Sequence, residues 1–400
     1  MTPLGLYVHI PFCETKCGYC DFYSVPVGDR ATAPLVDAVL HELHARLADS
    51  NAAQQLTLRT IFVGGGTPTL LEAEQLRRLM QTLGRIAREH AVVEFTVEAN
   101  PATVDDQKAA LLVEHGVTRV SMGAQSFFPN ELASLERLHS PADIAPSVEV
   151  LRRNGVGQIN LDLIFGIPGQ TLDTWSESLR RAVDLAPDHL ACYGLTYEPA
   201  TRLTAQRNHG LVTPCDETLE ARMHLRTLDQ LATAGYEQYE ISNFARPGRR
   251  CQHNLIYWRN EAYLGVGPSA AGCLGRRRYK NVPDLAAYTR WMAERGHAEG
   301  ESETLDDDQV AIEMVMMQLR LSEGLSPADF RRRLGVDPLE LYASGIGPLK
   351  QEGLIEATTE RMALTRSGQL LANPVIARIV SSGTIHPRGS ARGRRIALVP

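Results

Sequence analysis

From the amino terminus to about residue 235, short runs of apolar and β-branched residues alternate with longer amphipathic stretches. Short apolar runs are typical of buried strands, and the longer stretches have the period of helices that cover a sheet. Repeated units of this kind predict a parallel sheet. The predicted strands are Leu6 to Ile10, Arg59 to Val63, Val92 to Glu98, Thr118 to Met122, Gln158 to Leu163 and His189 to Leu195.

Helical patterns follow each of these strands and complete six strand and helix units. They cover Ala33 to Ala48, Glu72 to Arg88, Val104 to Glu114, Pro141 to Arg153, Asp173 to Leu185 and Asp216 to Ala234. Acidic residues at several of the starts favour a helix amino terminus. Because a closed barrel of this type has eight units, the pattern predicts an α/β protein with a partial (β/α)6 barrel in residues 1–235.

The pattern changes after residue 235. Residues 236–304 carry aromatic residues, glycine and proline without a clear helical period, and we interpret them as an extension packed beside the mouth of the barrel. Helical stretches and the segment GLIEATTERMALTRSG predict a smaller, mainly helical domain that resembles a winged helix in residues 305–380. The last stretch, 381–400, is rich in Ser, Gly and Arg, and we expect it to be disordered.

Composition narrows the classes of function. A formal charge of -6 over 400 residues offers no broad basic surface for nucleic acid, and the arginines at 331–333 stand beside as many acidic residues. Uncharged stretches are too short to span a bilayer. We therefore expect a cytoplasmic protein that is not embedded in a membrane and does not bind nucleic acid.

The seven cysteines favour metal chemistry in a reducing compartment over a disulfide framework. Cys13, Cys17 and Cys20 fall within eight residues, and the other four are scattered. Thiolates favour zinc or iron–sulfur clusters, but a closed structural zinc site takes four ligands, and no nearby residue supplies the fourth cleanly. A cubic four-iron cluster on three thiolates leaves one iron open to a ligand that donates nitrogen and oxygen together.

The run CETKCGYC resembles the radical S-adenosylmethionine (SAM) signature. The resemblance implies a [4Fe–4S] cluster on Cys13, Cys17 and Cys20 and SAM as the cofactor that supplies the radical chemistry. It also implies that Tyr19, between the second and third cysteines, contacts the adenine of the cofactor.

Further residues of chemical interest follow the predicted strands, where a parallel barrel gathers its site. The glycine run 64–66 would let a backbone approach a ligand closely, and it lacks the lysine of a phosphate-binding loop. Glu98 can accept hydrogen bonds from a ribose or an ammonium group. Taken singly, Gln125, Arg137 and Asp162 can also be a turn amide, a surface cation and a strand-end carboxylate.

Taken together, six motifs in order resemble the family of oxygen-independent coproporphyrinogen oxidases and their relatives, over residues 4–375. The motifs are YVHIPFC, GGGTP, EANP, SMGAQS, LDLIFGIPGQT and LTYEP. The resemblance implies that Tyr7, Gly65 and Glu98 contact the cluster-bound cofactor. It further implies a second cofactor molecule, at the positions Gly66, Thr67, Gln125, Arg137 and Asp162.

One branch of that family matches best. The oxidases carry a further cysteine where this chain has Phe22, and RCQHNLIYWRN resembles the heme chaperone branch known as HemW. The implied heme motif is His253, Asn254, Tyr257 and Trp258. A neutral imidazole can ligate heme iron, and Tyr and Trp rings can stack on a porphyrin. Cys251 is an alternative ligand, and a packed aromatic turn with structural hydrogen bonds at His253 is the alternative for the whole motif.

We therefore expect a heme chaperone on a radical SAM scaffold that passes heme to an apoprotein, for example a respiratory, membrane-associated one. It would be a monomer or a dimer that forms when the cluster is present. One alternative is an enzyme, either a coproporphyrinogen-III oxidase or a related radical SAM methyltransferase. Another is a regulatory module in which the cysteines hold zinc and the terminal unit binds nucleic acid.

Overall fold

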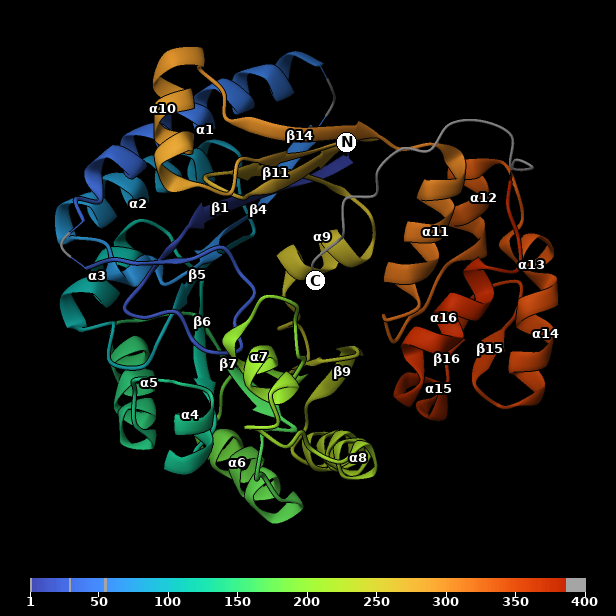
Figure 1. Ribbon diagram of the computed structural model, residues 1–400. Helices are drawn as coiled ribbons and strands as arrows, with labels where there is room; N and C mark the ends of the chain where they lie inside the picture. Colours follow the sequence, from blue (N-terminus) through green and yellow to red (C-terminus); the bar gives the residue numbers. More distant parts are fainter. Residues whose placement is uncertain (1, 29, 54–55, 386–400) are drawn as a thin grey trace. The chain divides into compact units, whose positions relative to one another are not determined.

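The computed structural model describes residues 2–28, 30–53 and 56–385. The chain forms two compact units, one that ends at Thr304 and one that begins at Leu305 (Figure 1). Of the stretch 381–400 that was expected to be disordered, residues 386–400 lie outside the described residues.

The first unit is built on a mixed sheet whose described strands run in the order β14-β13-β12-β11-β1-β4-β5-β6-β7-β8-β10-β9. All six predicted strands are confirmed, and their neighbours pair in parallel. The order has two ends, β14 and β9, so the sheet curves without closing. The six strands are β1 (Thr2–Ile10), β4 (Leu56–Gly65), β5 (Glu94–Ala99), β6 (Arg119–Gln125), β7 (Gln158–Phe165) and β8 (His189–Gly194).

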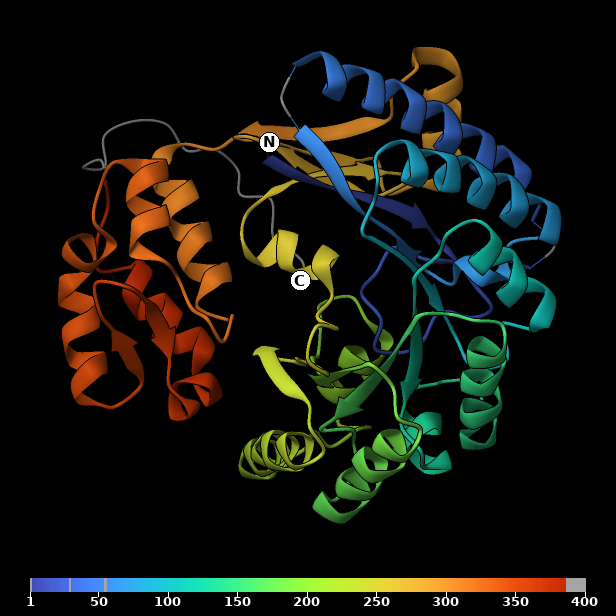
Figure 2. The same cartoon turned by 180° about the vertical axis from the view of Figure 1, so that it is seen from behind.

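The six predicted helices are also confirmed, and they surround the outer face of the sheet (Figures 1 and 2). Asp105 and Asp216 cap two of them, because each carboxylate accepts hydrogen bonds from amides of the first turn. The helices are α1 (Ala33–Ala53), α2 (Ala73–Glu89), α3 (Asp106–Glu114), α5 (Ile144–Arg153), α6 (Leu172–Asp184) and α8 (Glu217–Thr233). Shorter elements are η1 (Pro68–Leu70), α4 (Pro129–Ser134), η2 (Pro141–Asp143), α7 (Arg202–Asn208), β2 (Phe12–Cys13) and β3 (Val25–Pro26).

The two faces of the strands have opposite character. In β1, Leu6, Val8 and Ile10 are buried in the hydrophobic core under the helices. The alternate residues Tyr7 and His9 therefore face the inside of the curved sheet, because successive side chains of a strand point to opposite faces. The core lies between sheet and helices, and the interior of the barrel is lined by polar and aromatic side chains.

Residues 236–304 differ from the expected extension beside the mouth, because they lengthen the sheet at both ends. β11 pairs in parallel with β1, while β10 pairs with β8. The helix α9 lies on the concave side of the sheet, where it contacts β1, β4 and β11 (Figures 1 and 2). The elements are β9 (Glu237–Glu240), β10 (Asn243–Ala245), α9 (Gln252–Trp258), β11 (Ala262–Val266), β12 (Ala271–Leu274), β13 (Arg277–Asn281), α10 (Leu285–Arg295) and β14 (Glu299–Thr304).

The second unit is mainly helical with a two-stranded wing, as expected. β15 (Ile355–Ala357) pairs antiparallel with β16 (Met362–Leu364). Its three neighbouring arginines all have acidic partners, since Arg331 pairs with Asp337 and both other arginines pair with Asp329. The helices are α11 (Asp307–Gln318), α12 (Pro327–Leu334), α13 (Pro338–Leu341), α14 (Ala343–Gln351), α15 (Arg366–Leu370) and α16 (Ala372–Val380).

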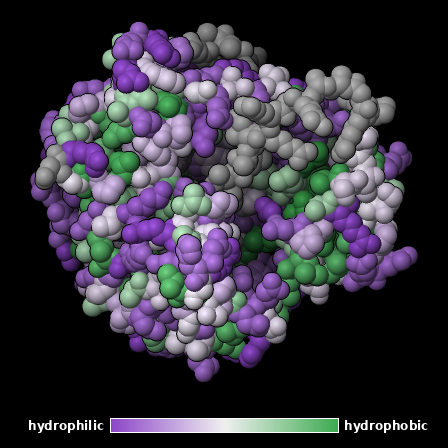
Figure 3. Space-filling model, in the orientation of Figure 1, coloured by the Kyte–Doolittle hydropathy of each residue, from purple (hydrophilic) through white to green (hydrophobic). Residues whose placement is uncertain are grey.

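The surface is mixed in character. On the face shown in Figure 3, hydrophobic residues form small patches among hydrophilic ones. Within the described ranges, none of the helices combines the length and the apolar character that crossing a membrane requires.

Candidate functional site

The cysteine triplet lies in the loop that begins at β2 and ends at β3. All three cysteines are free thiols and partly exposed. The amide of Cys20 donates to the carbonyl of Cys17 at 3.3 Å, and the amide of Leu203 in α7 donates to the carbonyl of Gly18 at 2.8 Å. Contacts within the loop and from a neighbouring helix therefore fix its path.

The chemistry of these thiols fits a metal cluster. Burial raises the pKa of Cys13 and raises the pKa of Cys20 to about 11, so these thiols need a strong cation to ionise. In the described part of the chain, no three His, Cys, Asp or Glu side chains lie close enough to hold one metal ion. A cubic cluster does not require three side chains around one metal ion, because each thiolate ligates a different iron.

The glycine run at the end of β4 packs directly against the strand that leads into the triplet. Gly65 has a φ of +101°, and a Cβ there would come within 2.3 Å of the His9 ring. A Cβ at Gly66 would lie 2.5 Å from the carbonyl oxygen of Phe12. Only glycine lets the two backbones approach this closely. The amide of Thr67 then donates to the same Phe12 carbonyl at 2.6 Å.

The residues expected around the cluster-bound cofactor lie together at the carboxyl ends of β1, β4 and β5. The amide of Gly65 donates to Glu98 Oε2 at 2.8 Å. Burial raises the pKa of Glu98 to about 8, and the nearby charge of Asp162 acts in the same direction. His9 Nε2 donates a hydrogen bond to the Tyr23 carbonyl at 2.8 Å, so Nδ1 of the neutral ring is an acceptor. The Tyr7 hydroxyl therefore donates to His9 Nδ1 at 2.9 Å.

Two of the residues expected around a second cofactor molecule, Arg137 and Gln125, lie against Gly123. Arg137 Nη2 donates to the Gly123 carbonyl at 2.8 Å and contacts the side chain of Asn100, while Nη1 lies 3.6 Å from Cys17 Sγ. A Cβ at Gly123 would meet Gln125 Nε2 at 2.7 Å and Asn100 Oδ1 at 3.0 Å. Among the described residues, the buried Nε of Arg137 has no hydrogen-bond partner. An anionic or polar ligand could satisfy it.

Two further features belong to this second set. Gln125 has a φ of +60°, a strained conformation for a residue with a side chain, and such strain is common at functional sites. Asp162 accepts hydrogen bonds from Asn160 at 2.7 Å and from Ser121 at 3.2 Å, and burial raises its pKa. Asn100 Nδ2 donates to Thr67 Oγ1 at 2.7 Å, which joins this set to the glycine run.

The expected heme motif lies in α9, inside the barrel. His253 is 1% exposed. Its Nδ1 lies 2.7 Å from Thr60 Oγ1 and its Nε2 lies 2.8 Å from the Tyr257 hydroxyl, so both ring nitrogens are hydrogen-bonded. Burial lowers the pKa of His253 to about 3, which keeps the ring neutral. Asn254 Nδ2 donates to the Tyr239 hydroxyl at 3.3 Å.

The start of α9 is held by a buried carboxylate. Glu94 accepts hydrogen bonds from the amides of Gln252 and His253 at 2.8 and 2.9 Å, and from the thiol of Cys251 at 3.4 Å. Burial raises the pKa of Cys251 to about 12, so the thiol stays protonated. The indole Nε1 of Trp258 is buried without a hydrogen-bond partner in the described ranges.

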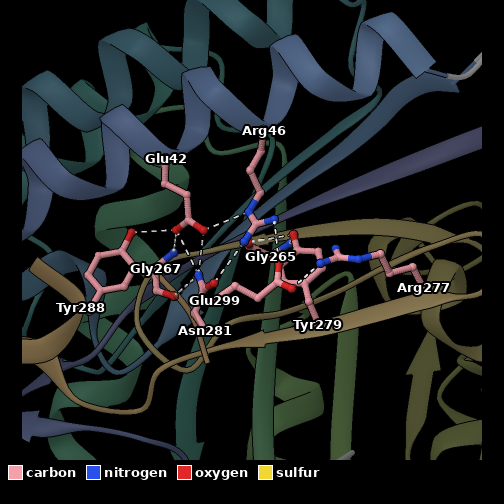
Figure 4. A network of polar contacts seen from close by, with 9 residues as sticks. All are labelled: Glu42, Arg46, Gly265, Gly267, Arg277, Tyr279, Asn281, Tyr288 and Glu299. Atoms are coloured by element: carbon pink, nitrogen blue, oxygen red, sulfur yellow. Dashed lines mark hydrogen bonds and ion pairs between the residues drawn. The ribbon is translucent and has the colours of Figure 1, made fainter. Parts of the chain in front are cut away.

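A polar network on the other side of β11 supports the same region (Figure 4). Glu42, 2% exposed, accepts hydrogen bonds from the Gly267 amide at 3.0 Å and from the Tyr288 hydroxyl at 2.8 Å, and it pairs with Arg46 at 2.9 Å. A Cβ at Gly267 would lie 2.4 Å from the carbonyl oxygen of His9. The network therefore fixes β11 and the loop after it against β1.

Sequence reasoning missed several residues that the geometry places in the site: His9, Thr60, Phe62, Glu94 and Asn100. Four of them, His9, Thr60, Phe62 and Glu94, lie in strands at positions that face inward. Alternation of apolar and polar residues within the predicted strands could have identified these inward positions. Asn100 stands in the EANP motif, two residues from Glu98.

Comparisons with known proteins agree with this architecture. Residues 7–182 match the family model of the radical SAM superfamily, and residues 305–371 match that of the HemN C-terminal domain. The crystal structure of coproporphyrinogen III oxidase (HemN) from Escherichia coli, a radical SAM enzyme, resembles this chain with a TM-score of 0.79. It covers 95% of this chain and 90% of its own, at 24% sequence identity, so this likeness shows the fold.

Curated relatives match over almost their full length. The heme chaperone HemW of Bacillus subtilis is 36% identical over 370 residues, which are 92% of this chain and 97% of that protein. The heme chaperone HemW of Escherichia coli is 33% identical over 382 residues, 94% of this chain and 98% of that protein. The heme chaperone HemW of Mycobacterium tuberculosis is 36% identical over 381 residues, 94% of each chain.

Proposed function

Since this chain belongs to the HemW family of heme chaperones within the radical SAM superfamily, we propose that it binds heme and delivers it to an apoprotein. It would do so with a [4Fe–4S] cluster and SAM at the carboxyl end of the barrel. The single observation that carries the proposal is that α9, with the proposed heme residues, contacts β1, β4 and β11 inside the same barrel whose carboxyl end carries the proposed cofactor residues.

In this proposal Cys13, Cys17 and Cys20 hold the cluster. When bound, the cluster and SAM together supply reductive cleavage of a sulfur–carbon bond. The protein's own part is to position the cofactor: the Gly65 backbone and the Glu98 carboxylate would accept its polar end, Tyr7 would line the site, and Tyr19 would contact the adenine.

A second SAM molecule would bind beside the first. The Arg137 guanidinium, one of whose nitrogens is buried and unpartnered in the described residues, would bind the carboxylate of that molecule. Gln125, Asp162, Gly66 and Thr67 would complete the set of residues around that molecule.

Heme is the cargo in this proposal, and His253 is its proposed ligand with Asn254, Tyr257 and Trp258 around it. In the present conformation both nitrogens of His253 are bonded and the ring is buried. Heme binding would therefore require α9 to move and one nitrogen to exchange its hydrogen bond for iron. The return of α9 would re-form those bonds and so favour release, which a protein that passes heme on requires.

The test is a heme titration of the anaerobically reconstituted protein, followed by transfer to a heme-free recipient. His253→Ala and Cys251→Ala should weaken heme binding or change its absorption spectrum relative to wild type, with His41→Ala, an exposed histidine on α1, as the control. Equal affinity and spectrum in all variants would contradict the assignment of the motif. The oligomeric state of the same preparation, measured with and without cluster, tests whether the protein is a monomer or a dimer that forms when the cluster is present.

The polar set around Gly123 favours one alternative function, an enzyme that uses two SAM molecules, such as an oxygen-independent coproporphyrinogen-III oxidase or a related methyltransferase. Phe22, which is 53% exposed beside the triplet, replaces the further cysteine of the oxidases. Anaerobic incubation with coproporphyrinogen III, SAM and a reductant separates the two, because formation of protoporphyrinogen would favour the enzyme.

The cytosol is the proposed location, since reduced thiols such as those of the triplet persist there.

A further inference from the structure

Six side-chain rings form a continuous series on the inner face of the barrel. The centroid separations along it are 5.0, 5.2, 6.1, 5.8 and 6.3 Å, all within the range of favourable ring contacts. In order, the series is Tyr257, His253, Phe62, Tyr7, His9 and Tyr23. It joins helix α9 to the segment that follows the third cysteine.

The two ends of the series belong to different sites. Tyr257 and His253 are members of the proposed heme motif, whereas Tyr7 is a proposed cofactor residue. Tyr23 lies three residues after Cys20, and its carbonyl accepts the hydrogen bond from His9. The series therefore connects the cargo site with the cofactor site through direct ring contacts.

Phe62 is the ring at which the two sites meet. It stacks on His253 with an interplanar angle of 27° and contacts Tyr7 at 33°. Its position in β4 is directly opposite Tyr7 in β1, and Thr60, two residues before it on the same face, binds His253 Nδ1. Because Phe62 is packed on both neighbours, displacement of either ring changes the packing of the other.

We propose that Phe62 is a positioning residue that couples the cofactor site to the heme motif, so that SAM weakens heme binding and heme weakens SAM binding. SAM at Tyr7 holds that ring, and through Phe62 it holds His253 and α9 in the observed closed position. Heme needs α9 to leave that position. Reciprocity follows from linkage, because a change in one affinity caused by the other ligand must be equal in both directions. This inference rests on the proposed heme function.

The experiment measures heme affinity of anaerobically reconstituted protein with and without saturating SAM, without reductant so that the cofactor stays intact. In wild type, SAM should weaken heme binding by roughly threefold to tenfold, the size expected for one aromatic pair contact. Phe62→Leu, which keeps most of the volume but removes the ring, should bring the ratio of the two affinities to about one. Phe62→Tyr should restore the ratio.

A buried phenylalanine on the outer face of the sheet gives the matched control. Phe95→Leu in β5 alters the core but not the series, so its ratio should equal that of wild type. A second measurement needs no heme: SAM should slow hydrogen exchange of the α9 amides in wild type and in Phe95→Leu, but not in Phe62→Leu.

The outcomes separate the inference from the proposed function. If wild type binds heme and SAM with independent affinities, and SAM does not slow exchange in α9, the coupling is wrong and the heme function stands. If wild type does not bind heme, the proposed function fails, and the coupling to heme fails with it. A ratio that is the same in Phe62→Leu and wild type would also overturn the role of Phe62.

Discussion

The amide of Gly65 donates a hydrogen bond to the Glu98 carboxylate at 2.8 Å, and this bond joins two motifs that are 33 residues apart. β4 and β5 are neighbours in the sheet, so the glycine run at the end of one strand meets the carboxylate near the end of the next. Burial raises the pKa of Glu98 to about 8, which places its titration close to neutral pH.

Glu98→Gln should remove a pH dependence from SAM binding. The ionised carboxylate accepts hydrogen bonds better than the protonated carboxyl group. The affinity of wild type for SAM should therefore rise from pH 6.5 to about pH 8, by at most about tenfold per pH unit, and change little at higher pH. Equilibrium binding at three pH values measures this. The variant should bind SAM more weakly at pH 8.5, and its affinity should lack the rise with pH that ionisation of Glu98 causes. Any effect of the titration of SAM itself persists in both proteins. A pH dependence identical in both would contradict the role of Glu98.

Replacing any one of Cys13, Cys17 and Cys20 by Ala should abolish stable cluster assembly. Three thiolates are the minimum set for a cluster with one open iron, and the loss of one exposes a second iron. Iron and sulfide analysis after anaerobic reconstitution checks this, with an absorption spectrum of the same sample. Cys273→Ala is the control, because that cysteine is also partly exposed but lies in β12. Zinc bound in place of iron and sulfide would refute the cluster.

The fold of the barrel was predictable because its elements repeat a local pattern. Each of the six strands carries an apolar set that packs under a helix with a matching apolar face. β11 was missed, because its five residues form a strand by pairing with β1, which lies more than 250 positions away in the sequence. Helix α9 was missed because a helix of seven residues is too short to be stable alone, so it depends on contacts with distant parts of the chain.

Motifs that carry chemistry indicate part of the candidate site from the sequence, whereas strand alternation gives only the inward position of the other residues and not their contacts. The cysteines and Glu98 stand in motifs that resemble a known family. Phe62 and Glu94 have no motif, and their roles arise from contacts with α9. The sequence offers structural hydrogen bonds at His253 as an alternative, and Tyr257 is a neighbour four residues along the same helix, but no local pattern shows that Thr60, 193 residues away, is the second partner.

Gly66→Ala should disturb the cysteine loop and lower cluster occupancy. The new Cβ would lie 2.5 Å from the Phe12 carbonyl oxygen, and because that neighbour is backbone, the strand that ends at Cys13 must shift. We expect a loss of about 1–3 kcal/mol in stability and a several-fold loss of cluster and SAM occupancy. Gly347→Ala, where nothing lies within 4 Å of the new Cβ, is the control and should keep the wild-type occupancy of cluster and SAM. Wild-type occupancy in Gly66→Ala would show that the loop can adjust.

His253→Gln should make the protein less sensitive to acid. His253 has a pKa of about 3 when folded and about 6.5 when unfolded, so between these values the unfolded chain binds an extra proton. This contribution to stability is complete above pH 6.5 and is lost as pH falls, at about 1.4 kcal/mol per pH unit. Denaturant unfolding at pH 7 and pH 5.5 gives the free energy of unfolding at each pH. This free energy should fall less between the two pH values in the variant than in wild type. His41→Gln on the exposed surface of α1 should keep the wild-type slope, and a wild-type slope in His253→Gln would show that the ring charges without cost.

Glu42→Gln should destabilise the first unit strongly, because the Glu42 carboxylate is surrounded by donors. The Gly267 amide and the Tyr288 hydroxyl both donate to it, and Arg46 pairs with it. An amide in its place would turn N–H groups toward other donors and leave the arginine without its nearest charge, which costs about 3–5 kcal/mol for a buried pair. Asp37→Asn lies on the same helix as Glu42 and breaks an exposed ion pair with Arg78 of α2, so it should cost about 0–1 kcal/mol. Denaturant unfolding of both variants measures the difference, and equal small losses would show that water replaces the carboxylate in the network.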